Sequence, residues 1–226
     1  MRSASLNQTA KALTLIEVLV VIAVLGILLL LFAVPTYDRR PTSAPMAQCS
    51  NNLRQIGVGF HLFAADHRDQ FPPRVSSTNG GSMELVGLGS PAAHFQALSN
   101  SIAQSLKVWV CPTDKIKKPA TNYAAFDDHN ISYFLSMDAS PAAAPAQFMN
   151  LAGDRHLEFA GKPVRPGLFT LTTNAPISWT RELHGHTRQS PGGWMLSVDG
   201  HVEFRGHGRV LAVQHKGLGT DLLAVP

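Results

Sequence analysis

Apolar residues run almost without interruption through residues 13–34 near the N-terminus, LTLIEVLVVIAVLGILLLLFAV. Glu17 is the one charged residue in these 22 positions. At 1.5 Å per residue, a helix of this length extends about 33 Å and exceeds the roughly 30 Å hydrocarbon core of a bilayer. The pattern predicts a membrane-spanning helix that carries one carboxylate. That carboxylate needs a partner, because a charge at the membrane centre costs about 2.5–3.5 kcal/mol.

A second helix is predicted after residues 35–45, PTYDRRPTSAP. The three prolines of this segment predict a kink or a short linker, because proline lacks a backbone donor and clashes with the preceding helical turn. Further on, apolar residues recur at spacings of three and four, as on one face of a helix of about 20 residues. This stripe consists of Met46, Cys49, Leu53, Ile56, Phe60 and Phe63.

Shorter patterns in the rest of the chain predict strands and loops. Residues 74–100 and 138–147 are rich in loop-forming residues, with a short helix expected from the low nineties to 105. Asp199-Gly200 is typical of a two-residue type I′ hairpin turn, in which both residues take positive φ. The expected strands are 106–111, 131–137, 167–172, and 194–198 paired with 201–204. The predicted class is α+β, with an antiparallel sheet in the C-terminal part.

Size and charge are those of one modest domain behind the apolar segment. The chain has 226 residues and a formal net charge of +4. About 190 residues remain after the first 34, enough for one hydrophobic core. The longest Lys/Arg cluster is the short KIKK at 115–118, so nucleic-acid binding is not expected.

The N-terminus carries a recognisable signature. Residues 1–12, MRSASLNQTAKA, are polar and hold two basic and no acidic residues, and Leu-Thr-Leu-Ile-Glu and the apolar run follow. This arrangement closely resembles the N-terminal signal of type IV pilins and type II secretion pseudopilins. The resemblance implies that a prepilin peptidase cuts between Ala12 and Leu13 and N-methylates the new amine. Ala12 stands where that family usually has Gly, and Leu13 where it usually has Phe or Met.

The same resemblance gives Glu17 a role. As the fifth residue of the mature chain, it would neutralise the N-terminal amine of a neighbouring subunit in a filament. A buried charge is tolerated when it is paired in this way. The competing interpretations are an ordinary secretory signal peptide, which has a shorter apolar core, and a plain single-pass anchor.

The chain after the apolar run is similar to a large pseudopilin-like family of planctomycetes and verrucomicrobia. The similarity rests on a Cys-x-x-Asn-Leu-x-Gln-Ile run and on short elements that follow in the same order. These are Cys49–Ile56, Val110–Asp114, Ser132-Tyr133, Ala152–Arg155, His184 and His186 before Gly192-Gly193, and Asp199–Val202.

The two cysteines are Cys49, on the apolar stripe of the second helix, and Cys111, at the end of a predicted strand. In an oxidising compartment two cysteines of one domain are expected to pair, and this bridge would clamp the helix to the sheet. Two buried free thiols are the alternative. Neither cysteine belongs to a CxxC motif, so a zinc or thioredoxin-type site is not indicated.

Ten histidines raise the question of a metal site. His184, His186, His201 and His207 would have to converge, but no HExxH motif or ligand-spaced carboxylate accompanies them. Asp154, Asp199 and Asp221 are too scattered in the sequence to predict a calcium site. There is also no GxSxG, P-loop or dinucleotide-binding motif. We therefore expect no metal, no cofactor and no enzymatic activity.

Together these features predict four segments: a cleaved leader (1–12), a transmembrane and assembly helix (13–34), a Pro-rich linker (35–45) and an extracytoplasmic α+β pilin-like domain (46–226). The expected function is that of a structural subunit, a pseudopilin or minor pilin. Its expected partners are the prepilin peptidase, other pilin subunits and an inner-membrane assembly platform. The alternatives are a membrane-anchored exported binding domain that does not polymerise, and a metal-dependent hydrolase using His184, His186 and His201.

Overall fold

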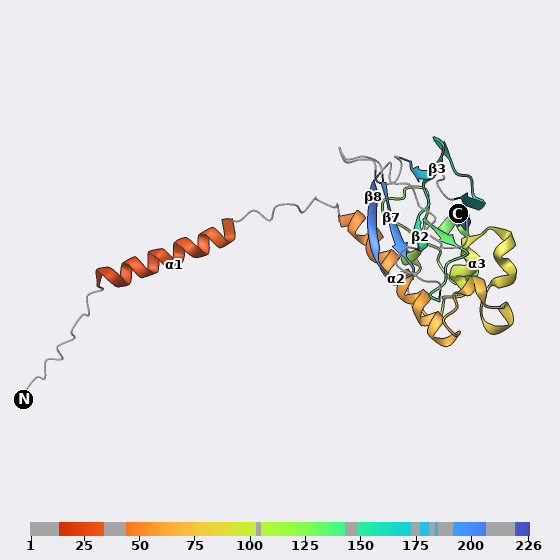
Figure 1. Cartoon of the computed structure of the whole chain (residues 1–226), viewed down its shortest axis with the longest axis horizontal. Helices are drawn as coiled ribbons and strands as arrows, with labels where there is room; N and C mark the ends of the chain where they lie inside the picture. The colour runs from red at the N-terminus through yellow and green to blue at the C-terminus, as the bar shows by residue number, and fades with distance from the viewer. Residues whose placement is uncertain are drawn as a thin grey trace, which may run out of the picture. The chain divides into compact units, whose positions relative to one another are not determined.

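The computed structural model describes residues 14–33, 44–102, 105–142, 149–172, 177–180, 184, 192–206 and 220–226. The chain divides into two compact units, residues 1–41 and 42–226 (Figure 1). The first contains helix α1, Leu15–Ala33. In the described part of the chain, no helix combines the length and the apolar character needed to cross a membrane. The spanning helix predicted over residues 13–34 is thus not found there.

The second unit begins with helix α2, Ala44–Asp66. The predicted apolar stripe forms its buried face, on which Cys49, Leu53, Ile56 and Phe60 are all 0% exposed. The helix begins two residues earlier than predicted, so Pro45 lies in its first turn. A proline is tolerated there because the first N–H groups of a helix have no intrahelical acceptor. Most of the predicted linker, residues 35–43, lies outside the described residues.

The rest of the second unit is built around two antiparallel sheets, which confirms the α+β class. Within the described residues, one sheet has six strands in the order β5-β9-β1-β2-β7-β8, and the other has three in the order β4-β3-β6. The strands are β1 Tyr133–Ser136, β2 Asn150–Asp154, β3 Leu157–Phe159, β4 Lys162–Pro163, β5 Gly167–Thr172, β6 Ile177–Trp179, β7 Gly192–Ser197, β8 Val202–Gly206 and β9 Thr220–Val225.

Both faces of the large sheet are buried, so successive residues of one strand enter different cores. In β1, Leu135 joins the core formed with α2, whereas Phe134 joins a second core with Trp179 of the small sheet. In β7, Leu196 likewise joins the core formed with α2, and Met195 joins the second core. The large sheet is therefore the middle layer between α2 and the three-stranded sheet.

Residues 106–111 do not form the predicted strand. Leu106–Trp109 is the 3-10 helix η4, held by short-range bonds such as Val108 N–H to the Ser105 carbonyl at 3.0 Å. The segment is tied to α2 by a side chain, because the Asn52 amide donates to the Val110 carbonyl at 3.0 Å. Its apolar residues are buried against the helix rather than in a sheet.

Short helices fill the long stretches between α2 and the first strand. Helix α3 ends much earlier than the helix expected up to 105. The elements are η1 Pro72–Arg74, η2 Ser77–Asn79, η3 Met83–Leu88, α3 Pro91–Gln96, η5 Tyr123–Ala125 and η6 Asp128–Asn130.

The β7–β8 hairpin forms as predicted, but with a different turn. Gly200 has a φ of 87°, and Asp199 does not have a positive φ. Gly200 N–H donates to the Ser197 carbonyl at 3.0 Å, and Ser197 N–H donates to the His201 carbonyl at 2.9 Å. This is a three-residue loop with glycine at the left-handed bulge position, so the type I′ prediction was wrong.

Glycine is required at position 193 in β7. A Cβ added there would overlap the indole ring of Trp179, which belongs to the small sheet and packs on this strand.

We expect Gly193→Ala to lower the free energy of unfolding by about 1–3 kcal/mol, because an added methyl group overpacks this contact. Urea unfolding of the full chain, followed by tryptophan fluorescence, measures this loss. Gly206→Ala in the neighbouring strand meets open space and is the control; equal losses in both variants would contradict the prediction.

A second prediction concerns His94 of α3, which is 0% exposed and whose Nδ1 lies 2.7 Å from the Ser82 hydroxyl. Burial lowers the pKa of His94 to about 4. In the unfolded chain His94 therefore becomes protonated near pH 6.5, whereas in the folded chain it becomes protonated only near pH 4. Stability conferred by the neutral imidazole is complete above this window and falls by up to about 3 kcal/mol as the pH drops through it.

His94→Gln should flatten the dependence of the unfolding free energy on pH between 6.5 and 4. His201→Gln, at an exposed site, should leave it unchanged. A wild-type slope that survives in His94→Gln would assign the effect to another group.

Candidate functional site

The first candidate site is the start of α1. Thr14 N–H and the Thr14 hydroxyl donate to Glu17 Oε2 at 2.8 and 2.9 Å, and Glu17 N–H faces the Thr14 hydroxyl at 3.4 Å. Val18 N–H donates to the Thr14 carbonyl. This is a capping box, in which a Thr and a Glu three residues later satisfy each other's backbone N–H groups. Thr14 is thus the N-cap, and the helix begins at Leu15.

The capping box changes the interpretation of Glu17. Its carboxylate was expected to need a partner from another subunit, yet one oxygen already accepts two bonds from its own chain. The Thr-x-x-Glu pattern is visible in the sequence and could have identified this pairing. Glu17 Oε1 accepts no hydrogen bond from the described residues, so it can take a second donor. Ala12 and Leu13, the predicted processing residues, lie outside the described residues.

Apart from Thr14 and Glu17, the side chains of α1 that are described in residues 14–28 are apolar. Its large apolar side chains are between 44% and 80% exposed. They are Leu15, Ile16, Val18, Leu19, Val20, Val21, Ile22, Val24, Leu25, Ile27 and Leu28. A helix that is apolar all round is stable only when it is buried among other apolar groups. The described turns of α1 therefore present apolar side chains in several directions, with Glu17 as the one charge among them.

The second candidate site is a polar cluster in the interior of the second unit, made of Cys49, Cys111, Thr113, Asp154 and His184. Cys49 of α2 and Cys111, which follows η4, form a disulfide bond, and both residues are fully buried. The bond clamps α2 to the segment after a 3-10 helix, and not to a strand as expected. It spans 62 positions of the sequence. Closing a loop of this length typically contributes about 2–4 kcal/mol of stability.

Thr113 places its hydroxyl at the centre of this buried cluster. The Oγ1 atom lies 2.9 Å from Cys111 Sγ, 3.8 Å from Cys49 Sγ and 3.4 Å from His184 Nδ1. Thr113 is half-buried and Pro112 beside it is exposed. The cluster therefore lies just beneath the surface at this point.

Asp154, at the end of β2, orients His184. Its Oδ2 atom accepts from His184 Nε2 at 2.8 Å and from Trp194 N–H at 2.7 Å, and both side chains of the pair are 0% exposed. Because a carboxylate accepts, Nε2 carries a proton and Nδ1 faces the Thr113 hydroxyl. Phe204 covers the imidazole edge at a centroid distance of 6.1 Å.

A second polar network adjoins the buried cluster through the 111–114 segment. Asp114 accepts from Arg155 Nε at 2.8 Å and Nη2 at 3.2 Å, from the Ser132 hydroxyl at 2.9 Å and from Ile116 N–H at 3.1 Å. Burial raises the pKa of Asp114, but these donors and the charge of Arg155 outweigh it and hold the pKa below its usual value. The carboxylate is thus ionised and fully paired inside the protein.

The short sequence elements singled out after the apolar run meet in these two networks. The Cys-x-x-Asn run supplies Cys49 and Asn52, and the 110–114, 132–133 and 152–155 segments supply the other partners. Both cysteines could be predicted as a pair from the sequence, whereas the roles of Thr113 and Asp154 could not. Their position within the same short elements was the available signal.

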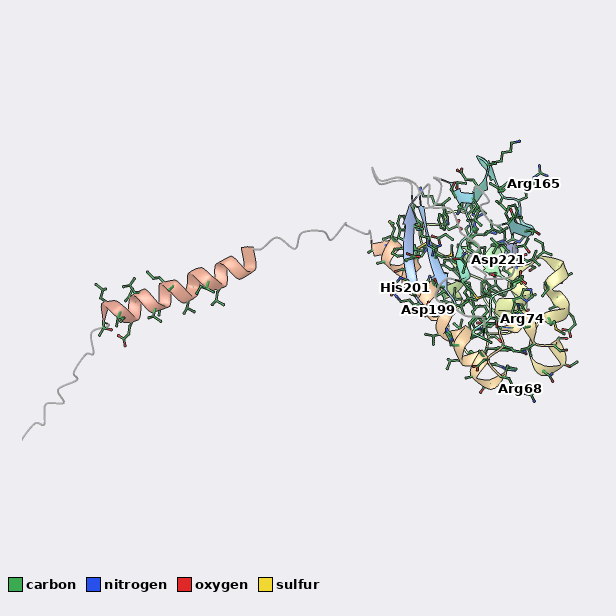
Figure 2. All side chains as sticks on the ribbon, in the orientation of Figure 1. Arg68, Arg74, Arg165, Asp199, His201 and Asp221 are labelled. Atoms are coloured by element: carbon green, nitrogen blue, oxygen red, sulfur yellow. A yellow bond between two sulfur atoms is a disulfide. The ribbon has the colours of Figure 1, made fainter. Side chains whose placement is uncertain are left out.

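Of the histidines proposed as a hydrolase site, the two that the structure describes, His184 and His201, lie in different environments. His184 is buried beside Asp154, whereas His201 is exposed at the β7–β8 turn, where its N–H donates to Asp199 (Figure 2). His186 and His207 lie outside the described residues. The three aspartates considered for calcium are also in separate environments, since Asp221 is buried against the Ser136 hydroxyl.

Comparison with known proteins identifies the N-terminal segment alone. Residues 7–33 match the prokaryotic N-terminal methylation motif. The match is consistent with a type IV pilin-like signal and includes the predicted cleavage position and the capping box. No curated protein and no solved structure matches the chain.

The Asp114–Arg155 pair yields a test of the second network. Arg155→Met leaves a buried carboxylate without its cation, so we expect the free energy of unfolding to fall by about 3 kcal/mol at pH 7. Because the pKa of Asp114 is depressed, its stabilising effect exists above about pH 4 and is lost as the pH falls through the folded pKa. The deficit of the variant should therefore shrink on acidification.

Urea unfolding at several pH values measures this deficit. Arg165→Met, at an exposed arginine (Figure 2), should stay within about 0.5 kcal/mol of the wild type. A deficit of the same size at pH 7 and pH 3 would assign the loss to packing and not to charge.

Proposed function

We propose that this protein is a structural subunit, a pseudopilin or minor pilin, of a type II secretion or type IV pilus-like filament. The observation that carries the proposal is the methylation motif over residues 7–33. A prepilin peptidase would remove residues 1–12 between Ala12 and Leu13 and methylate the Leu13 amine. The capped helix α1 would then begin two residues after the new N-terminus.

Assembly would take place through α1. Its apolar side chains are exposed on all sides in the described residues, which suits a helix that exchanges lipid for neighbouring helices during polymerisation. The proposed location is the inner membrane, with a single anchoring segment and residues 46–226 outside the cytoplasm. The Cys49–Cys111 disulfide suits that oxidising side. The proposed partners are other pilin subunits and an inner-membrane assembly platform.

Glu17 would have two roles in this proposal. Its Oε2 atom caps its own helix through Thr14, and Oε1 would accept from the methylated Leu13 amine of a neighbouring subunit. Capping holds the carboxylate at the first turn of α1, close to where that amine must dock. A preorganised acceptor loses less side-chain entropy when the partner arrives.

An enzymatic role is not part of the proposal. The disulfide holds both cysteines, and the His184–Asp154 pair is fully enclosed. A hydrolase based on His184 and His201 has no support from their positions, one buried and the other at an exposed turn. An anchored exported domain that does not polymerise is the alternative that the following experiments separate.

The first experiment tests processing. We expect the membrane-extracted protein to begin at Leu13 with a methylated amine in cells that contain the prepilin peptidase, and at Met1 in cells that lack it. Intact mass measurement and N-terminal sequencing read out both. A chain that keeps Met1 in both strains, or one cut after Val34, would refute the filament proposal.

The second experiment separates the two roles of Glu17. Glutamine serves in a capping box as glutamate does, so Glu17→Gln keeps the cap and removes the charge. Thr14→Ala removes the cap, worth about 0.5–2 kcal/mol of helix stability, and keeps the charge. We expect both variants to be processed, but only Glu17→Gln to lose crosslinked oligomers in the cell envelope. The reverse outcome would mean that Glu17 acts as a helix cap alone.

A further inference from the structure

We propose that Cys49, Cys111 and His184 bind a zinc ion in the dithiol form of this protein, and that the disulfide and the metal are mutually exclusive states of one site. This proposal concerns the second unit and does not rest on filament assembly. It assigns a ligand to the buried cluster, to which the filament proposal gives no chemistry.

The three side chains offer a suitable set of donor atoms. Among the described residues they form a group in which Cys49 Sγ, Cys111 Sγ and one ring nitrogen of His184 all lie within 4.8 Å of one another. Two thiolates and an imidazole are ligands that zinc prefers, and structural zinc sites use such sets in tetrahedral geometry. The ligands come from α2, from the segment after η4 and from position 184, so the site joins separate parts of the fold.

Thr113 marks the place where the ion would sit. Its hydroxyl contacts both sulfur atoms and His184 Nδ1, at 2.9, 3.8 and 3.4 Å. A single hydroxyl group therefore contacts all three donor residues. The fourth ligand would be either this oxygen or, if the Thr113 side chain rotates away, a water molecule.

Asp154 supplies the outer support that zinc-bound histidines need. A ligating histidine almost always donates its second ring N–H to a carboxylate or carbonyl, which orients the ring and raises its basicity. His184 Nε2 donates to Asp154 Oδ2 at 2.8 Å, and Trp194 N–H holds the same oxygen at 2.7 Å. This leaves Nδ1 facing the Thr113 hydroxyl, which also contacts both sulfur atoms.

The exchange between the two states is a balanced two-electron step. When a low-molecular-weight disulfide RSSR oxidises the zinc-bound dithiolate, the Cys49–Cys111 bond forms and the RS–SR bond breaks. Two protons are taken up to give two RSH, and Zn²⁺ leaves. In the reverse direction a thiol reductant supplies the two electrons, and metal binding displaces the two thiol protons.

The physical consequence is that α2 stays attached to the segment after η4 in both redox states. Before the disulfide forms, zinc would hold the same two points together. A chain that folds under reducing conditions would then have the clamp that oxidation later makes covalent. Exposed Pro112 and half-buried Thr113 adjoin Cys111 in the sequence, so the cluster lies close to the protein surface at this point.

The test uses the full chain, purified in detergent and reduced with a phosphine that does not bind zinc. We expect one zinc ion per reduced chain by elemental analysis and none per oxidised chain. Cobalt(II) in place of zinc should give a thiolate charge-transfer band and the visible absorption of a tetrahedral site. A reduced wild-type chain that takes up no zinc would overturn the proposal.

Variants identify the ligands. Cys49→Ser, Cys111→Ser and His184→Ala should each weaken zinc binding at least tenfold, and Asp154→Asn by about 10–100-fold. His201→Ala, at the exposed turn, is the matched histidine control and should bind as the wild type does. Equal affinity of His184→Ala and wild type would show binding by the two cysteines alone and refute the site.

Circular dichroism of each variant shows whether it is still folded. If His184→Ala is unfolded, the cobalt spectrum of the wild-type chain still decides. A spectrum that requires two sulfur ligands and one nitrogen ligand supports the site, and one without tetrahedral character or without thiolate ligation overturns it.

Discussion

Burial of polar groups at the junction between α2 and the large sheet is the constraint on which the second unit depends. Removing an ionisable side chain from water costs free energy, which hydrogen bonds to that side chain offset. Asp154 is paired with His184 and with a backbone N–H of β7, and Asp114 with Arg155 and Ser132. Each pairing joins segments that are far apart in sequence. Satisfying them requires the 111–114 segment, β2 and β7 to take up one relative arrangement.

The disulfide acts on the same junction. Cys49 lies on the stripe of α2 that packs on the sheet, and Cys111 begins the short segment that carries Thr113 and Asp114. A covalent link here fixes the helix against the segment that supplies both polar networks. The glycine at position 193 and the Trp179 ring above it then complete the opposite face of β7.

The two units differ in the burial of their apolar side chains. In the second unit, the buried apolar side chains that the structure describes form two cores. In α1 the large apolar side chains described between Leu15 and Leu28 are exposed. In the proposed filament, this difference would allow the second unit to keep its fold while α1 changes its neighbours.

Local patterns in the sequence determined the parts of this protein that depend on neighbouring residues. Side-chain spacing within a few residues or turns accounts for the apolar run, the Thr-x-x-Glu start of α1, the stripe on α2, the strand 167–172 and the β7–β8 hairpin.

Only the tertiary structure decided which residues meet. Residues 106–111 were expected to form a strand, but they are held by α2 and turn as a 3-10 helix. His184 was expected to join His201 if it bound a metal, yet it lies with Cys49, Cys111 and Asp154. Spacing along the chain carries no information about such contacts, because they are set by how α2 and the sheet pack across long separations.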